Sequence, residues 1–249
     1  MTLSRISLAL VLALVLVVAV LAAAPARLLH LVLPGEQVVM QGLSGTLWNG
    51  RASRCLLRLP PGYLHLGAVE WSLQPLSLLA LAPRVQLSSR WGQQRVNGEL
   101  VFRGATDLDV RELQLSVAAD LVRQFAPLAV DGALDVDIGE LLLRDGLPHA
   151  GQGRLVWQNA GFLSPRGRVP LGSFAVDFSQ QPGAALQGEV ITLAGPLQAD
   201  GAVELQGRRY RIDLLLDSEY AMDDQLRQAL SLMARPQGDA YRIELDAEF

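Results

Sequence analysis

The chain has 249 residues, of which 50% are apolar and 18% are charged, a composition that supports a sizeable core and excludes general disorder. This length suits one large domain or two small ones. The formal net charge of −4 argues against nucleic acid as a partner, because phosphate binding needs a basic surface.

An uncharged run of 19 residues, Ile6–Ala24, lies near the N-terminus between Arg5 and Arg27. As a helix it would extend about 28 Å, close to the ~30 Å hydrocarbon core of a bilayer. A cleaved signal peptide usually has a shorter apolar region. We therefore favour an uncleaved transmembrane anchor, and Pro25 would end its helix.

Two sites keep cleavage open as an alternative. Ala22–Ala24 resembles a cleavage box, although Pro25 would follow the cut, and cleavage after Ala26 is the second option. With an uncleaved segment, residues 1–27 form a cytoplasmic tip and transmembrane anchor. Residues 28–249 then form an exported β domain.

Downstream of this run, Gly42–Gly50 reads Gly-Leu-Ser-Gly-Thr-Leu-Trp-Asn-Gly. Gly45 and Gly50 bracket Trp48, which predicts a tight first strand and turn where two backbones approach closely. Trp48 is interpreted as a packing anchor of the sheet. Cys55 is the only cysteine, so no intrachain disulfide can form, and it is expected to be a small buried residue. A thiol that bridges two chains or reacts is the alternative.

After Pro34 the apolar residues recur at every second position, which is typical of half-buried strands. The segments with this pattern are Leu134–Ile138, Phe174–Phe178, Val203–Leu205, Tyr210–Leu216 and Tyr241–Phe249. Turn signals separate them: Trp91-Gly92, Arg103-Gly104, Asp145-Gly146, Gln181–Gly183 and Gln206-Gly207. The pattern predicts a mainly β fold, with a long, curved antiparallel sheet.

Two short stretches have helical spacing instead. Asp120–Phe125 predicts one short helix, and Met222–Met233 predicts a second, in which Asp223 and Asp224 suit the helix N-terminus. Each has about the length needed to cover an open end or edge of a sheet. A lid over a ligand cavity is the alternative for the second helix.

A weak internal repeat relates residues 36–127 to residues 128–249. Leu66–Pro75 resembles Leu171–Pro182, and Trp48 has a counterpart in Trp157. Two related half-sheets stacked into one curved structure would explain the similarity. Chance likeness among strands of similar composition explains it nearly as well.

A search for chemistry finds no catalytic, cofactor-binding or metal-ligating set. His30, His65 and His149 are widely separated, and neither a nucleophile elbow nor a phosphate-binding loop is present. Ser44 has no implied base. Asp135 and Asp137 belong to the polar face of a strand and are expected to be solvated. The chain is predicted not to be an enzyme and to need no cofactor.

The whole pattern resembles the type II secretion system protein N family. The resemblance rests on the single anchor, Gly45–Gly50, Trp71-x-Leu73-x-Pro75 with Leu78-Leu79, Gly151–Trp157 and the C-terminal Gly238-x-x-Tyr241 strand. It implies a bitopic inner-membrane protein with a periplasmic β domain, in the machine that moves folded proteins through the outer membrane. It also implies other inner-membrane components as partners, a structural or interaction role and no catalytic residues.

Two further hypotheses remain. A long sheet with one apolar face, anchored in the inner membrane, also resembles AsmA-type lipid transporters, with membrane lipid as the ligand of an apolar groove. An exported hydrolase is the third hypothesis, and the absence of a catalytic constellation argues against it. Self-association of the β domain also stays open.

Overall fold

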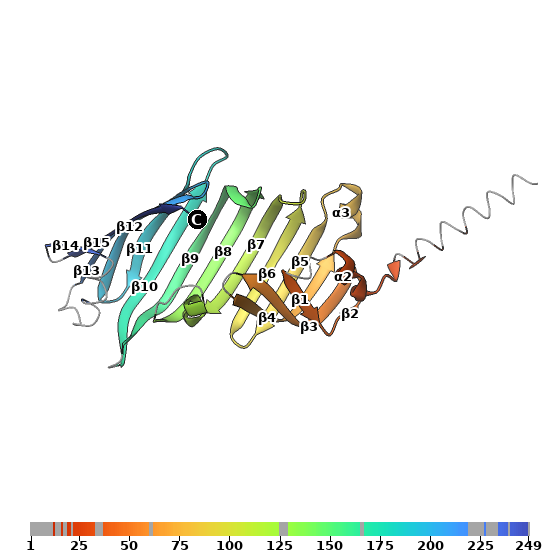
Figure 1. Cartoon of the computed structure of the whole chain (residues 1–249), viewed down its shortest axis with the longest axis horizontal. Coiled ribbons are helices and arrows are strands. Elements are labelled where there is room, and N and C mark those ends of the chain that lie inside the picture. Colours follow the sequence, from red (N-terminus) through yellow and green to blue (C-terminus); the bar gives the residue numbers. More distant parts are fainter. Residues whose placement is uncertain are drawn as a thin grey trace, which may run out of the picture.

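The computed structural model describes residues 12, 16, 19–20, 22–32, 37–59, 62–124, 129–164, 167–218, 227, 234–238 and 240–248. These residues form one open antiparallel sheet of fifteen strands with a few short helices (Figure 1). The predicted mainly β fold is therefore confirmed. The greater part of Ile6–Ala24 lies outside the described residues, and none of the helices described is long and apolar enough to cross a membrane.

The strands follow one another across the sheet almost in chain order. They are β1 (Val38–Gln41), β2 (Ser44–Gly45), β3 (Asn49–Leu59), β4 (Gly62–Leu73), β5 (Arg84–Trp91), β6 (Gln94–Phe102), β7 (Leu108–Ala118), β8 (Val130–Arg144), β9 (Leu147–Ser164), β10 (Gly167–Gln180), β11 (Leu186–Ala194), β12 (Leu197–Gln206), β13 (Arg209–Ser218), β14 (Arg235–Gln237) and β15 (Ala240–Glu248). β1 and β2 both pair with β3, and β15 lies between β13 and β14. The chain is thus a meander from β3 to β13.

The predicted turns are where the structure has its hairpin connections. Asp145 and Gly146 both have positive φ, 50° and 74°, as a two-residue type I′ turn between β8 and β9 requires. Gly92 and Gly207 supply positive φ in the β5–β6 and β12–β13 turns. Short hairpins with these turns hold each strand beside its predecessor and fix its register.

The alternation of the sequence becomes two different faces of the sheet. Residues in register across β7–β11 form one apolar row: Leu115, Val136, Leu155, Val176 and Val190. The adjacent row is polar: Gln114, Asp137, Arg154, Asp177 and Glu189. Cross-strand neighbours on one face are therefore of one kind, which is the pairing that stabilises a sheet.

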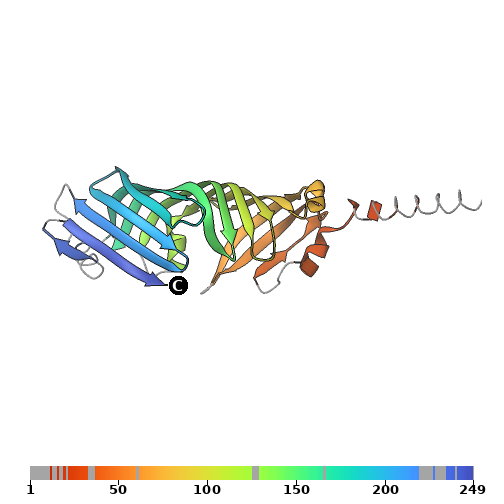
Figure 2. The ribbon, with the colours of Figure 1, turned by 90° about the horizontal axis from the view of Figure 1, so that it is seen from above.

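The sheet is twisted and curved, so its end strands lie at an angle to the central strands (Figure 2). Irregular pairing accompanies this curvature. Glu112 and Asn159 have positive φ, 50° and 48°, where the registers of β7 and β9 shift. Gly172 has a φ of 137° at a register shift in β10, and a Cβ there would lie 3.1 Å from Gly195. Such bulges bend a strand and increase its twist.

The Gly42–Gly50 segment forms β2, a turn and the start of β3. Gly45 pairs with Gly50, and a Cβ on Gly45 would lie 2.6 Å from the carbonyl oxygen of Asn49, so the predicted close approach is confirmed. Thr46 closes the turn, because its amide donates to Asn49 O at 2.9 Å.

The buried tryptophan beside this turn is Trp71, not Trp48. Trp71 is 7% exposed, lies over Gly50 and donates its indole N–H to Leu47 O at 3.1 Å. Trp48 is only half-buried, because it lies in the turn rather than within a strand. Trp157, the predicted counterpart of Trp48, lies within β9 and donates to Asp131 O at 3.1 Å, so its position resembles that of Trp71.

The described helices are all short. η1 (Ala26–Leu28) and α2 (Leu29–Val32) precede β1, α3 (Pro75–Leu79) joins β4 to β5, and η2 (Ala119–Gln124) follows β7. The helix predicted at Asp120–Phe125 is confirmed as the 3₁₀ helix η2. Met222–Met233 lies outside the described residues except for Arg227. The predicted half-repeat boundary falls in the β7–β8 connection, and the sheet continues across it.

We predict that Trp71→Ala lowers the free energy of unfolding by about 3–5 kcal/mol, because it removes a buried ring and leaves a cavity over Gly50. Urea denaturation followed by far-ultraviolet circular dichroism measures this loss. Trp91→Ala is the matched control, since Trp91 is 52% exposed, and should cost about 1 kcal/mol or less. Equal losses in the two variants would contradict the assignment of Trp71 as the anchor.

Candidate interaction surfaces

The apolar face of the sheet has little covering it in the part of the chain that the structure describes. Each strand makes its main contacts with its sheet neighbours, η2 adds contacts to β8, and η1 packs on β3. Most apolar side chains of the central strands, including Leu134, Val136 and Leu155, are consequently half-buried rather than buried. Open apolar faces of this kind are typical of interaction surfaces.

The apolar face is densest in two clusters. The first surrounds Trp71 with Ala26 and Ala52, and Leu29 and Val85 pack against it. The second lies on β9–β13 and contains the buried residues Ala160, Leu171, Phe174, Val190, Leu197, Ala199 and Leu216. The two clusters hold the two ends of the sheet, while the rows between them stay partly open.

The opposite face carries cross-strand ion pairs. Arg154 Nε lies 2.7 Å from Asp177 Oδ1, and Arg242 donates from Nε and Nη2 to the two oxygens of Asp213 at 2.9 and 2.6 Å. The hydrogen bond from Arg242 holds the pKa of Asp213 below its ordinary value. These pairs are exposed, so they set register and solubility more than stability.

Shallow grooves follow the polar face. The larger has a volume of about 770 Å³ and lies over β2–β7, where Arg51, Glu70, Ser88, Asn97 and Glu99 line it. A smaller groove of about 350 Å³ lies over β6–β9. Both have mixed charge and hydrogen-bonding side chains, which suits a polar partner surface rather than an apolar ligand.

The polar residues that could take part in catalysis or metal binding do not meet in one site among the described residues. Asp135 and Asp137 line the smaller groove beside Arg95 and Arg154, and Ser44 lines the larger one. The three histidines stay on separate elements, with His30 and His149 exposed and His65 stacked on Trp91 at 6.2 Å. Among the described residues, no group of three or more His, Cys, Asp or Glu could hold a metal ion. Asp223 and Asp224 lie outside the described residues.

Cys55 lies in β3 and is 2% exposed, so the predicted burial is confirmed. Desolvation by this burial raises the pKa of its thiol. A protonated, buried thiol is a poor nucleophile and is out of reach of a second chain. In the folded protein Cys55 therefore packs as a small apolar side chain.

An ion-pair cluster that no sequence pattern predicts lies at one edge of the sheet. The side chain of Asp109 in β7 is 3% exposed and accepts hydrogen bonds from Arg103 Nε at 2.8 Å and Arg144 Nη1 at 2.9 Å. Burial alone would raise the pKa of Asp109, but the two guanidinium groups outweigh it and hold that pKa below its ordinary value. The cluster ties the β6–β7 loop to the end of β8.

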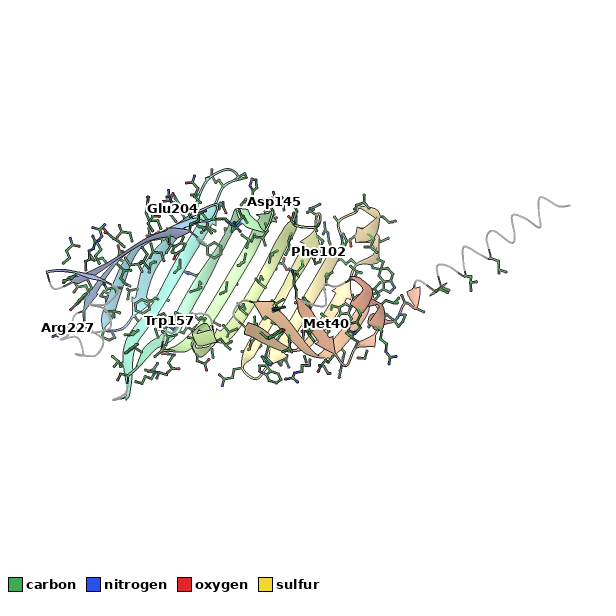
Figure 3. The ribbon with its side chains drawn as sticks, viewed as in Figure 1. Met40, Phe102, Asp145, Trp157, Glu204 and Arg227 are labelled. Carbon is green, nitrogen blue, oxygen red and sulfur yellow. The ribbon has the colours of Figure 1, made fainter. Side chains whose placement is uncertain are left out.

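The neighbouring hairpin turn joins the same cluster. The amide of Asp145, which Figure 3 labels at this edge, donates to Asp107 Oδ1 at 3.2 Å. Thr106 Oγ1 donates to Asp145 Oδ1 at 3.3 Å. The only sequence signals were the turn residues Arg103-Gly104 and Asp145-Gly146, and nothing local predicted that the two turns would meet.

The two ends of the sheet have unpaired edges of different character. β1 presents Val38–Gln41 beside the N-terminal helices, and its outer backbone groups have no sheet partner in the described chain. β14 is three residues long, is exposed, and contains Pro236, which cannot donate a ladder hydrogen bond. The edge at β14 is thus protected against pairing, whereas the edge at β1 is available for it.

The described residues form an open sheet with one apolar face, polar grooves and an available edge. These features are typical of a binding or scaffold protein. The sequence profile described as type II secretion system protein N matches residues 36–244. The chain belongs to this family.

Curated relatives agree with this assignment. Type II secretion system protein N of Aeromonas hydrophila is 31% identical over 218 residues, which cover 84% of this chain and 83% of that protein. The protein of the same name from Vibrio cholerae is 26% identical over 218 residues, covering 82% and 81%. That of Klebsiella pneumoniae is 28% identical over 188 residues, covering 74% and 71%. No solved structure gives a significant match, and the AsmA-like alternative gains no support from these comparisons.

We predict that Asp109→Asn lowers the free energy of unfolding by about 1–3 kcal/mol at pH 7, because two arginines lose a buried charged acceptor. The folded-state pKa lies below the unfolded value of about 3.9. The stabilisation is therefore fully present above about pH 4 and is lost as the pH falls through the folded-state pKa.

Urea denaturation at pH 7 and at acid pH tests this prediction. The difference in the free energy of unfolding between wild type and Asp109→Asn should be smaller at acid pH. Asp137→Asn is the control, because Asp137 is exposed on the polar face and its loss should change stability by about 0.5 kcal/mol or less. A difference that does not depend on pH would contradict the ionic assignment.

Proposed function

We propose that this chain is an inner-membrane-anchored component of the type II secretion system. In this proposal residues 1–27 are an uncleaved anchor with a short cytoplasmic tip, and the β sheet lies in the periplasm. The sheet has a structural role, binding neighbouring inner-membrane components of the machine that exports folded proteins across the outer membrane. Family membership and the uncharged Ile6–Ala24 run support this proposal.

The observation that carries the proposal is the junction between the apolar run and the sheet. Leu47 donates its amide to Ala24 O at 2.8 Å, and Pro25 forms an isolated antiparallel bridge with Thr46. Ala26 is 1% exposed and packs with Ala52 and Trp71. The last residues of the run are thus part of the fold, which supports an anchor rigidly joined to the sheet.

The same junction bears on processing of the N-terminus. Cleavage after Ala26 would remove the Ala24 carbonyl and the Ala26 side chain from the Trp71 cluster. It would also leave a charged amino terminus at the edge of that cluster, where burial of a charge is costly. These losses favour retention of the whole N-terminal segment.

Sodium carbonate extraction and N-terminal sequencing test the anchor. The protein should stay with the membrane pellet. Its N-terminal sequence should lie ahead of the Ile6–Ala24 run, and not start at Pro25 or Arg27. Release by carbonate, or a mature chain that starts at Pro25 or Arg27, would contradict the uncleaved anchor. Insertion of a signal-peptidase site between Arg27 and Leu28 is the matched control, and should release a destabilised soluble domain.

The interaction role is tested by complementing a deletion strain with variants that carry a photoreactive residue. A photoreactive residue at Val39, on the available edge at β1, should crosslink to an inner-membrane component of the secretion system. The same residue at Gln237, on the protected edge at β14, is the control and should crosslink much less. If neither position crosslinks and the deletion strain secretes its exoproteins normally, the proposed role is wrong.

A further inference from the structure

The connection between β4 and β5 contains the most exposed large apolar side chains described in the sheet domain. Leu76, Leu79 and Leu81 are 79%, 84% and 85% exposed. Outside this connection, the large apolar side chains described from residue 24 onward are at most 52% exposed. We call Pro75–Pro83, which contains α3, the leucine tip.

Hydrogen bonds made by Ser77, on the inner side of the leucine tip, hold its shape. Ser77 is 8% exposed, donates to Gln74 O at 2.5 Å and accepts a hydrogen bond from the amide of Arg84 at 2.9 Å. The amide of Ala82 donates to Ser77 O at 3.2 Å. These bonds leave the leucines of the tip on the outside.

The backbone of Leu81 has an unfavourable conformation. Its φ is 52°, a left-handed conformation that glycine adopts at little cost and that is unfavourable for a leucine. A leucine that is both strained and 85% exposed stabilises neither the backbone nor the core. Its side chain is therefore best explained by something outside the chain that covers it.

The tip lies at the edge of the sheet from which the N-terminal apolar run departs. The amide of Leu73, just before the tip, donates to Trp48 O at 2.7 Å, and the amide of Leu47 donates to Ala24 O. α3 and α2 accordingly lie at the same end of the sheet in both views (Figures 1 and 2). Leu12, Leu16 and Val20 of the run are 63–69% exposed, so run and tip present the same chemistry.

The charge distribution along the chain also indicates a membrane surface as the partner of the leucine tip. Residues 27–98 carry seven arginines against Glu36 and Glu70, a formal charge of +5. Residues 99–249 carry thirteen arginines and twenty-three acidic residues, a formal charge of −10. The tip itself has no charged residue from Pro75 to Pro83. An apolar tip on a basic end, with an acidic far end, suits an anionic bilayer surface.

We propose that the leucine tip inserts into the lipid bilayer beside the N-terminal anchor. The sheet then has two attachments to the membrane, the anchor and the tip, and these set its orientation with the basic end at the bilayer and the acidic end away from it. This inference rests on the proposed anchor. It adds a second membrane-binding site that the anchor alone does not require.

The test places a fluorophore in the tip without removing a leucine. Cys55→Ala removes the native thiol, and Ala80→Cys, at an exposed position between the leucines, takes an environment-sensitive label. The full chain is reconstituted in vesicles of phosphatidylethanolamine and phosphatidylglycerol that contain spin-labelled lipid. Ala184→Cys is the control, because Ala184 is exposed in the β10–β11 turn on the same edge but far along the sheet.

Lipid quenching of the label at position 80 should exceed that at position 184 several-fold, and Leu76→Gln with Leu79→Gln should abolish the difference. Equal quenching at the two positions, or quenching that survives both glutamines, would overturn the proposal. Shielding of position 80 in native membranes but not in these vesicles would assign the tip to a protein partner and also overturn it. Protein that a carbonate wash removes from the vesicles would contradict the anchor, whereas retained protein with an unquenched position 80 contradicts the tip alone.

Discussion

Cross-strand pairing between successive strands is the constraint on which this structure depends. Because the described residues form a single layer, the backbone of each strand from β4 to β12 is held by the strand before it and the strand after it. A shift of one residue in any pair would move apolar side chains to the polar face. The turn at Asp145-Gly146, the bulge at Glu112 and the exposed ion pairs all protect this register.

The single layer also gives the two faces different uses. The apolar rows are closed at the Trp71 cluster and at the cluster around Phe174, and are partly open between them. The polar face carries mixed charges and shallow grooves. A secretion component that binds neighbouring subunits needs extended surfaces of this kind more than it needs a pocket. The strained Leu81 and its exposed neighbours add an exposed apolar surface at one edge.

Local patterns predict the mainly β fold and several of its strands, because period two and turn residues act within a few positions of one another. β8, β10, β13 and β15 lie where alternation predicted strands, and η2 lies where helical spacing predicted a helix. The sequence pattern is wrong in predicting Trp48 as the packing anchor. Burial depends on which strand crosses Gly50, and that strand carries Trp71. No local pattern predicts the Asp109 cluster, because Arg103 in the β6–β7 loop and Arg144 at the end of β8 are brought together only by the sheet.

The sequence by itself determined the alternating faces, the hairpin turns, the apolar N-terminal run and the likeness to the type II secretion system protein N family, since each of these is written in adjacent residues. Only the tertiary structure decided which apolar residues are covered. Leu76, Leu79 and Leu81 have the composition of a core segment, and a sequence pattern cannot distinguish them from buried leucines. They are exposed because Ser77 turns the connection outward at the edge of a sheet that has no second layer there among the described residues.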